Sequence, residues 1–257
     1  MSNSDEELSP SGVPMIRYAP PTEEFIPAIG DSENIEAITR HIENYIGPPD
    51  TVLHEIISDR VHIDVHVVKP TFRRNFYTLI TSGMSDLPMN APPQLPSAQF
   101  AELLICLPPN WILPLEGDAV TGSGNGSTAS AAESEENYWP IRWLKILAKF
   151  PHEYNTWLGD GHTLPNGDPP SGFAPNTKLC CMMLKPPTKF ASGLHTLKTK
   201  EGKLINFYAL VPLYLDEVNL KLNKSSEDLH ARLKSAGVTE LLDINRKSVC
   251  SKWPWSR

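Results

Sequence analysis

The stretch HIDVHVVKP, residues 62–70, carries the residues whose spacing points most directly to chemistry. His62, Asp64 and His66 alternate with apolar residues, so a strand here would point all three side chains to one face, about 7 Å apart. Two imidazoles and a carboxylate suit zinc, and strand twist can bring them together. One hypothesis is therefore a metal-dependent hydrolase that uses these three residues. The alternative is that they form the polar face of a half-exposed strand.

Other catalytic motifs are missing from the sequence. Residues 81–86, TSGMSD, contain two serines and an aspartate but do not match the G-x-S-x-G pattern of a nucleophile elbow. No phosphate-binding loop motif occurs, and the four cysteines include no C-x-x-C pair, so we predict reduced, structural thiols. These motifs give an enzyme only weak support.

Charge and hydropathy narrow the class of partner. The formal net charge is -7, and the lysines and arginines are scattered, which argues against nucleic acid as the main ligand. No apolar run is long enough to span a membrane, and the acidic start MSNSDEELSP is unlike a signal peptide. We therefore expect a cytoplasmic protein. Its acidic surface would suit a basic protein partner, but solubility is the more common reason for a modest negative charge.

The elements that must position these residues come in clusters, without regular alternation of strand and helix. We predict a flexible arm over 1–26 and one domain over 27–250, with a flexible insertion rich in Gly, Ser and Glu over 116–137. Apolar periodicity and capping residues predict helices at 31–46, 140–150, 215–223 and 226–237. Apolar runs predict strands at 52–58, 61–68, 76–81, 100–108, 178–184 and 204–213. This pattern favours an α+β fold with a mixed, mainly antiparallel sheet.

Four aromatic residues lie within twenty positions: Trp139, Trp143, Tyr154 and Trp157. Tryptophan and tyrosine often anchor protein interfaces. The alternative is that these rings fill the core between helix and sheet, which we expect for at least half of them.

Four long segments resemble the suppressor-of-fused family, and together they extend over about residues 30–250. They are HIDVHVVKPTFRRNFYTLITSGMSDLPM (62–89), LKILAKFPHEYNTWLGDGHTLPNGDPPSGFAPNTKLCCMMLKPP (144–187), INFYALVPLYLDEVNLKL (205–222) and DINRKSVC (243–250). The resemblance implies one α+β domain, like the N-terminal half of the animal protein and like compact bacterial members. It also implies that the strand motif at His62 and Asp64 is a fold signature rather than a metal site.

The family resemblance implies a binding protein and not an enzyme, so we expect no catalytic residue, no metal ligand and no cofactor. Animal members sequester a zinc-finger transcription factor by holding an extended peptide between two domains, whereas this chain resembles only one of those domains. Single-domain bacterial members are regarded as immunity proteins of polymorphic toxin systems. The implication we favour is an immunity protein that binds and neutralises a toxin domain. The alternative is a regulatory adaptor that adds an extended peptide to a sheet edge.

A partner-binding surface is expected at two places in the sequence. The first is the end of the strand at 76–81 with the turn after it, and the second is the long loop at 158–177 with the residues just before it. The candidate residues are Tyr77, Thr81, Ser82, Gly83, Met84 and Ser85, together with His152, Trp157, Gly161 and His162.

Overall fold

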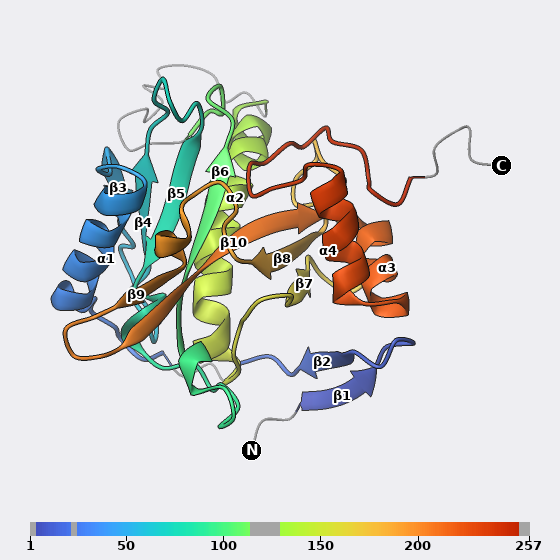
Figure 1. Ribbon diagram of the computed structural model, residues 1–257, viewed down its shortest axis with the longest axis horizontal. Coiled ribbons are helices and arrows are strands. Elements are labelled where there is room, and N and C mark those ends of the chain that lie inside the picture. Colours follow the sequence, from blue (N-terminus) through green and yellow to red (C-terminus); the bar gives the residue numbers. More distant parts are fainter. Residues whose placement is uncertain (1–3, 22–24, 114–128, 252–257) are drawn as a thin grey trace.

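A computed structural model describes residues 4–21, 25–113 and 129–251 of the chain (Figure 1). Its centre is an eight-stranded sheet in the order β3-β4-β5-β6-β10-β8-β7, with β9 also paired to β10. The bounds of these strands are β3 (Thr51–Leu53), β4 (Asp64–Val68), β5 (Tyr77–Ser82), β6 (Phe100–Leu107), β7 (Thr163–Pro165), β8 (Cys181–Lys185), β9 (Thr196–Lys198) and β10 (Leu204–Leu213).

Among the strand pairs in the described part of the chain, only β6 with β10 is parallel, and the others are antiparallel. This confirms the predicted α+β class and the mainly antiparallel sheet. The short connections around β3, β4, β5 and β6 explain the antiparallel part, because a parallel pair needs a long crossover. The crossover between β6 and β10 contains the long helix α2 (Ala129–Glu153).

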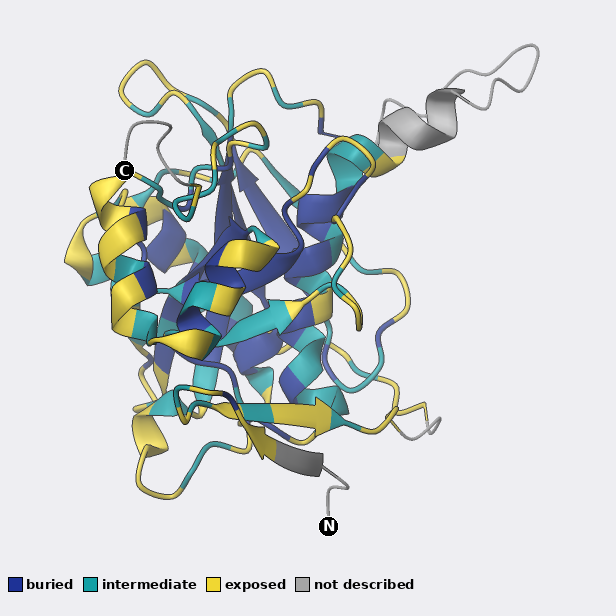
Figure 2. Ribbon diagram, turned by 90° about the vertical axis from the view of Figure 1, so that its right-hand side faces the viewer, coloured by how far each residue is buried: buried dark blue, intermediate teal, exposed yellow. Residues whose placement is uncertain are grey.

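Two helices cover opposite faces of the sheet (Figure 1). Helix α1 (Ser32–Tyr45) begins where the Asp31 side chain accepts hydrogen bonds from two backbone amides of the first turn, and its Ile38 and Ile42 are fully buried. They belong to an apolar cluster with Ile80 and Leu104, which point to that face of the sheet. Helix α2 packs on the other face, in the largest apolar cluster, against alternate residues of β4, β5 and β6. The sheet is therefore buried on both sides over its central strands, as Figure 2 shows.

Two shorter helices, α3 (Leu215–Asn223) and α4 (Ser226–Ser235), pack against residues of β8 and β10. Their bounds agree with the helices expected at 215–223 and from 226, and Ser225 caps α4 by accepting from the Asp228 amide. Three short 3-10 turns complete the domain, η1 (Met84–Asp86), η2 (Pro96–Ala98) and η3 (Ser192–His195). None of the helices in the described ranges is long and apolar enough to cross a bilayer.

The N-terminal segment, predicted as a flexible arm over 1–26, contains regular structure that the sequence did not indicate. Strands β1 (Ser4–Leu8) and β2 (Pro14–Tyr18) form an antiparallel hairpin. The Ser11 amide donates to the carbonyl of Leu222 in α3, and the Tyr18 hydroxyl lies 2.7 Å from Thr156 Oγ1. Long-range contacts of this kind are invisible to local periodicity, which is why the hairpin was missed.

The bounds of several other helices and strands differ from those predicted from the sequence. The helix expected at 140–150 begins at Ala129, so Pro140 lies inside α2 and not in its first turn. Residues 116–128 of the expected insertion lie outside the described residues, and 129–137 belong to α2. The strand expected at 52–58 ends at Leu53, and β7 lies within the expected loop at 158–177. Of the four clustered aromatic residues, Trp139 and Trp143 are buried in the core, while Tyr154 and Trp157 are half-buried.

Candidate functional site around the Gly83 turn

The turn after β5 is held in close contact with the residue that precedes β4. Gly83 has a φ of +105°, and a Cβ at this position would lie 1.8 Å from the backbone carbonyl oxygen of His62. Only glycine combines this backbone conformation with so close an approach. The two segments that the sequence singled out, HIDVH and TSGMSD, therefore meet at Gly83.

Beneath the turn lies Glu102 of β6, a carboxylate with no exposed surface. Its Oε1 accepts hydrogen bonds from the Gly83 amide at 3.1 Å, the Ser85 amide at 3.0 Å and the Ser85 hydroxyl at 2.6 Å. Its Oε2 accepts from the Thr81 hydroxyl at 2.6 Å. Burial raises the pKa of Glu102 to about 7, although these donors oppose the shift. One buried carboxyl group thus satisfies two backbone amides and two hydroxyl donors of the turn.

The outer side of the turn is held by groups from three other parts of the chain. His152 of α2 donates from Nε2 to the Met84 carbonyl at 2.9 Å, and burial lowers the pKa of this histidine. Lys203 Nζ donates to the Ser85 carbonyl at 3.1 Å, and Asn34 Nδ2 of α1 donates to the Ser85 hydroxyl at 2.9 Å. The turn is a rigid junction between α1, α2 and the sheet.

The expected partner surface is not supported at this turn, because most of its side chains are inaccessible. Residues Thr81, Ser82, Met84 and Ser85 have 0% exposed surface, and Gly83 is buried with them. The physical reason is that β5 is an inner strand covered by helices on both faces. These five residues cannot contact a partner in this conformation; Tyr77, at the start of β5, is half-buried.

The other expected residues separate into two groups. His152 joins the turn through Met84, as described. Trp157 packs edge-on against His162, with ring centroids 4.4 Å apart, and Lys221 of α3 donates to the Gly161 carbonyl at 2.6 Å. Burial lowers the pKa of His162 to about 4. This second group lies where the 158–177 loop meets α3, and its role in partner binding stays a prediction.

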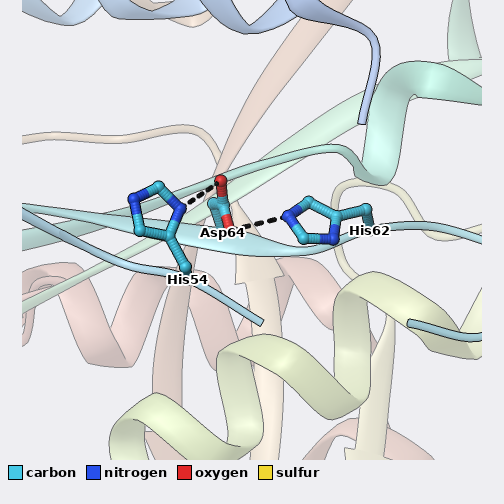
Figure 3. A group of neighbouring side chains, drawn as sticks. All are labelled: His54, His62 and Asp64. Carbon is cyan, nitrogen blue, oxygen red and sulfur yellow. Dashed lines mark hydrogen bonds and ion pairs between the residues drawn. The ribbon is translucent and has the colours of Figure 1, made fainter. Parts of the chain in front are cut away.

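A polar cluster centred on Asp64 lies beside the turn (Figure 3). His54 Nδ1 is 3.0 Å from Asp64 Oδ2, and His62 Nε2 is 3.1 Å from Asp64 Oδ1, so the carboxylate lies between two imidazoles. Ser58 Oγ is 2.6 Å from His62 Nδ1, on the far side of that ring. The Asp64 side chain is 6% exposed, that of His62 21% and that of His54 69%.

The less favoured hypothesis of a metal site at His62, Asp64 and His66 does not agree with the structure at His66. Strand β4 begins at Asp64, so His62 precedes the strand, and His66 points into the fold, 2% exposed, with Nε2 2.9 Å from the Ser82 hydroxyl. Burial lowers the pKa of His66 to about 4. His54 takes its place in the cluster, because Leu53 pairs with Val65 and sets the next residue opposite Asp64.

A shallow apolar surface adjoins the cluster. Residues 25–30 run beside residues 56–60, held by bonds from the Ala28 amide to the Ser58 carbonyl and from the Arg60 amide to the Ile26 carbonyl. Between them is a hollow of about 370 Å³, with Ile29, Ile35, Ile56 and His62 in its lining. Ile29 is 96% exposed, Ile56 91% and Ile57 74%, and Phe25 and Ile26 are also exposed. We call these five exposed residues, Phe25, Ile26, Ile29, Ile56 and Ile57, the isoleucine surface.

Comparison with known proteins places this domain in a family. The family model described as suppressor of fused protein (SUFU) matches residues 59–247, well over half of the chain. The chain therefore belongs to the suppressor-of-fused family, as its sequence segments indicated. No curated protein sequence matches it.

Solved structures agree with this assignment at the level of the fold. A putative SUFU homologue from Neisseria gonorrhoeae matches with a TM-score of 0.58 and 15% identity, over 86% of this chain and 98% of that one. The structure of a Sufu–Fu complex matches with a TM-score of 0.56 and 15% identity, over 84% and 92%. Drosophila Suppressor of Fused matches with a TM-score of 0.54 and 15% identity, over 90% of this chain but 52% of the Drosophila chain.

Proposed function

We propose that this chain is a non-catalytic protein-binding domain, and that it acts as an immunity protein that binds and neutralises a toxin domain. The observation that carries the proposal is the isoleucine surface. Ile29 and Ile56 are almost fully exposed and line the same hollow. Exposed apolar patches on soluble proteins commonly mark binding sites. The four free cysteines suit a reducing, cytoplasmic location.

The size and charge of the surface suit a protein partner. Burying one isoleucine side chain fully contributes about 1.5–3 kcal/mol, so Ile29, Ile56 and Ile57 together could provide most of the affinity of a tight complex. Asp59 lies close to the two isoleucines of the second segment, and the chain as a whole has a net charge of -7. A basic toxin domain with an apolar protrusion fits both features.

The relatives support protein binding in general. One of the similar structures is a complex of Sufu with Fu, so at least one protein with this fold binds another protein. The second candidate is a regulatory adaptor that captures an extended peptide. It is favoured by β3, which forms one edge of the sheet and whose residues are only half-buried.

The test is affinity capture of the tagged chain from its native cells, followed by binding measurements with the purified partner. We expect a stoichiometric toxin-like protein whose toxic activity is lost at a 1:1 ratio. The substitution Ile56→Asp should weaken this complex about 30-fold or more, because it places a charge in the apolar contact. Ile112→Asp is the matched control: Ile112 is 69% exposed and follows the end of β6 that pairs with the start of β5, opposite the Gly83 turn.

Three results would contradict the immunity role. The first is a captured toxin that binds Ile56→Asp as well as the wild-type chain. The second is a preference for short linear peptides, which would favour the adaptor. The third is multiple turnover of a small substrate by the purified chain, which would make it an enzyme.

A further inference from the structure

We propose that His54, His62 and Asp64 form a binding site for one divalent transition-metal ion of the zinc class. Each residue offers one ligand atom, and these three atoms all lie within 4.8 Å of one another. The inference concerns this chain alone and does not rest on a protein partner.

The ligand types select the class of metal. Imidazole nitrogen suits zinc, cobalt, nickel and copper, whereas magnesium and calcium prefer sites made of oxygen atoms only. Two imidazoles with one carboxylate are a common ligand set of catalytic and other open zinc sites. The carboxylate of Glu55, next to His54 in the sequence, is already paired with Lys149 at 2.6 Å, so three protein ligands are available.

The geometry needs only a small adjustment to hold an ion. With zinc–ligand bonds of about 2.0–2.1 Å, tetrahedral ligand atoms lie roughly 3.3 Å apart. His54 Nδ1 is already 3.0 Å from Asp64 Oδ2, and His62 Nε2 is 3.1 Å from Asp64 Oδ1. To share one ion, the two imidazoles must approach each other, and the carboxylate must bind through both oxygens or turn one of them toward both rings. The His54 side chain is 69% exposed and can rotate without disturbing the core.

Two neighbouring groups fix the other ligands. The Glu55 amide donates to Asp64 Oδ1 at 3.2 Å, which orients the nearly buried carboxylate. Ser58 Oγ lies 2.6 Å from His62 Nδ1, and when this hydroxyl accepts from the ring N–H, the lone pair of Nε2 faces Asp64. Outer partners of this kind orient histidine ligands and raise their basicity. With the lone pair and the carboxylate directed at each other, a cation between them is strongly favoured.

The remaining coordination position faces outward. His54 is exposed, and His62 also lines the hollow next to Ile56 and Ile29. A water molecule can therefore complete the coordination of the metal, and the site is of the open kind.

The experiment uses the full chain, freed of any affinity tag and of metal by dialysis against a chelator. Co²⁺ is added while its visible ligand-field bands are recorded, and Zn²⁺ is then added to displace it. We expect one ion per chain, micromolar or tighter binding, and intense bands typical of tetrahedral coordination. Calorimetry with Zn²⁺ gives the stoichiometry independently.

Four substitutions assign the ligands. His54→Asn keeps a donor for Asp64 but removes the metal-binding nitrogen, so we expect about a hundredfold weaker binding, and Asp64→Asn should do the same. Ser58→Ala should weaken binding about tenfold through His62. His195→Asn is the matched control, because this histidine lies in η3 and bonds the Pro187 carbonyl, and it should bind metal like the wild-type chain.

Two outcomes would overturn the site. One is the lack of Co²⁺ bands at millimolar metal. The other is equal affinity in His54→Asn and the wild type, which would mean that both histidines only donate hydrogen bonds to Asp64. His54 is exposed, so its variant folds even if Asp64→Asn does not, and its circular dichroism spectrum checks this.

Discussion

Removing the carboxyl group of Glu102 should loosen the Gly83 turn, and the size of the effect follows from the hydrogen bonds. In Glu102→Ala the amides of Gly83 and Ser85 lose their acceptor in a site without water access. Each unsatisfied buried donor costs about 1–3 kcal/mol, so the two together cost about 2–6 kcal/mol. The Thr81 hydroxyl can turn to the Leu103 carbonyl, 3.4 Å away, and adds little.

Glu102→Gln is the control that keeps the shape. Its amide oxygen can accept from both backbone amides, and its NH₂ group can donate to Thr81 Oγ1. Because burial disfavours the charged form of Glu102, replacing it with a neutral amide removes no net stabilisation, and we expect the variant to unfold within about 1 kcal/mol of the wild type at neutral pH.

The same pair of variants also tests the ionisation of Glu102. Its pKa is about 7 in the fold and near the ordinary 4.5 in the unfolded chain. Between these values the folded form holds a proton that the unfolded form has lost, so the free energy of unfolding falls as the pH rises through this window. Relative to Glu102→Gln, the wild-type chain should lose on the order of 3 kcal/mol between pH 4.5 and pH 7.5.

Equilibrium unfolding in urea, followed by tryptophan fluorescence and circular dichroism, measures these free energies. Hydrogen exchange of the Gly83 and Ser85 amides reports the turn itself. The reasoning is refuted if Glu102→Ala unfolds within about 1 kcal/mol of the wild type. A glutamine variant as unstable as the alanine variant would also refute it, because hydrogen bonds from the turn would then not account for the loss of stability.

Three further perturbations test other parts of the fold. Gly83→Ala should cost more than about 3 kcal/mol in urea unfolding because its Cβ would meet the His62 carbonyl oxygen, whereas Gly202→Ala, with φ +86° and open space around it, should cost about 1–2 kcal/mol. The pKa of His66 is about 4 in the fold and near 6.5 in the unfolded chain. Its contribution to stability is therefore present above pH 6.5 and is lost as the pH falls toward 4. The thermal unfolding temperature of His66→Gln should depend less on pH over that range. Arg246→Ala leaves the buried Glu217 carboxylate without its 2.6 Å partner and should lower the free energy of unfolding by about 3–5 kcal/mol. Arg40→Ala removes only an exposed pair with Glu36 and should lower it by less than about 1 kcal/mol. Similar losses in the two arginine variants would contradict this.

Local signals in the sequence were sufficient for the helices that begin at clear caps. The sequence offers Asp31 or Ser32 as the cap of α1 and Ser225 or Ser226 as the cap of α4, because capping depends on residues within one turn. In the structure Asp31 and Ser225 are the caps. The start of α2 was misplaced because Pro140 resembles a first-turn proline, whereas the structure places it inside the helix.

The candidate site was only partly predictable, for a different reason. His62 and Asp64 were recognised from their spacing, but His54 enters through the antiparallel register of β3 and β4, which the sequence does not specify. The motif H-E-x-x-S-x-x-x-H-x-D, residues 54–64, could have signalled it, since all its named residues lie in or beside the cluster. The sequence did not indicate that Ser85 is buried, because its partner Glu102 is a charged residue within an apolar strand. Glu102 is buried only because β6 pairs with β5, and local sequence does not show that pairing.

The parallel pairing of β6 with β10 has a consequence during synthesis of the chain. Phe100 pairs with Ile205, which leaves the ribosome more than a hundred residues later. Because the ribosome adds about 5–20 residues per second, the apolar edge of β6 stays unpaired for several seconds or more after β3 to β6 have been synthesised. Such an edge can template pairing with another chain, so chaperone dependence should peak in this interval. Ribosome-bound chains stalled near residue 190 should therefore aggregate or recruit chaperones more than chains stalled after complete release of β10, and equal behaviour would show that β6 is shielded earlier.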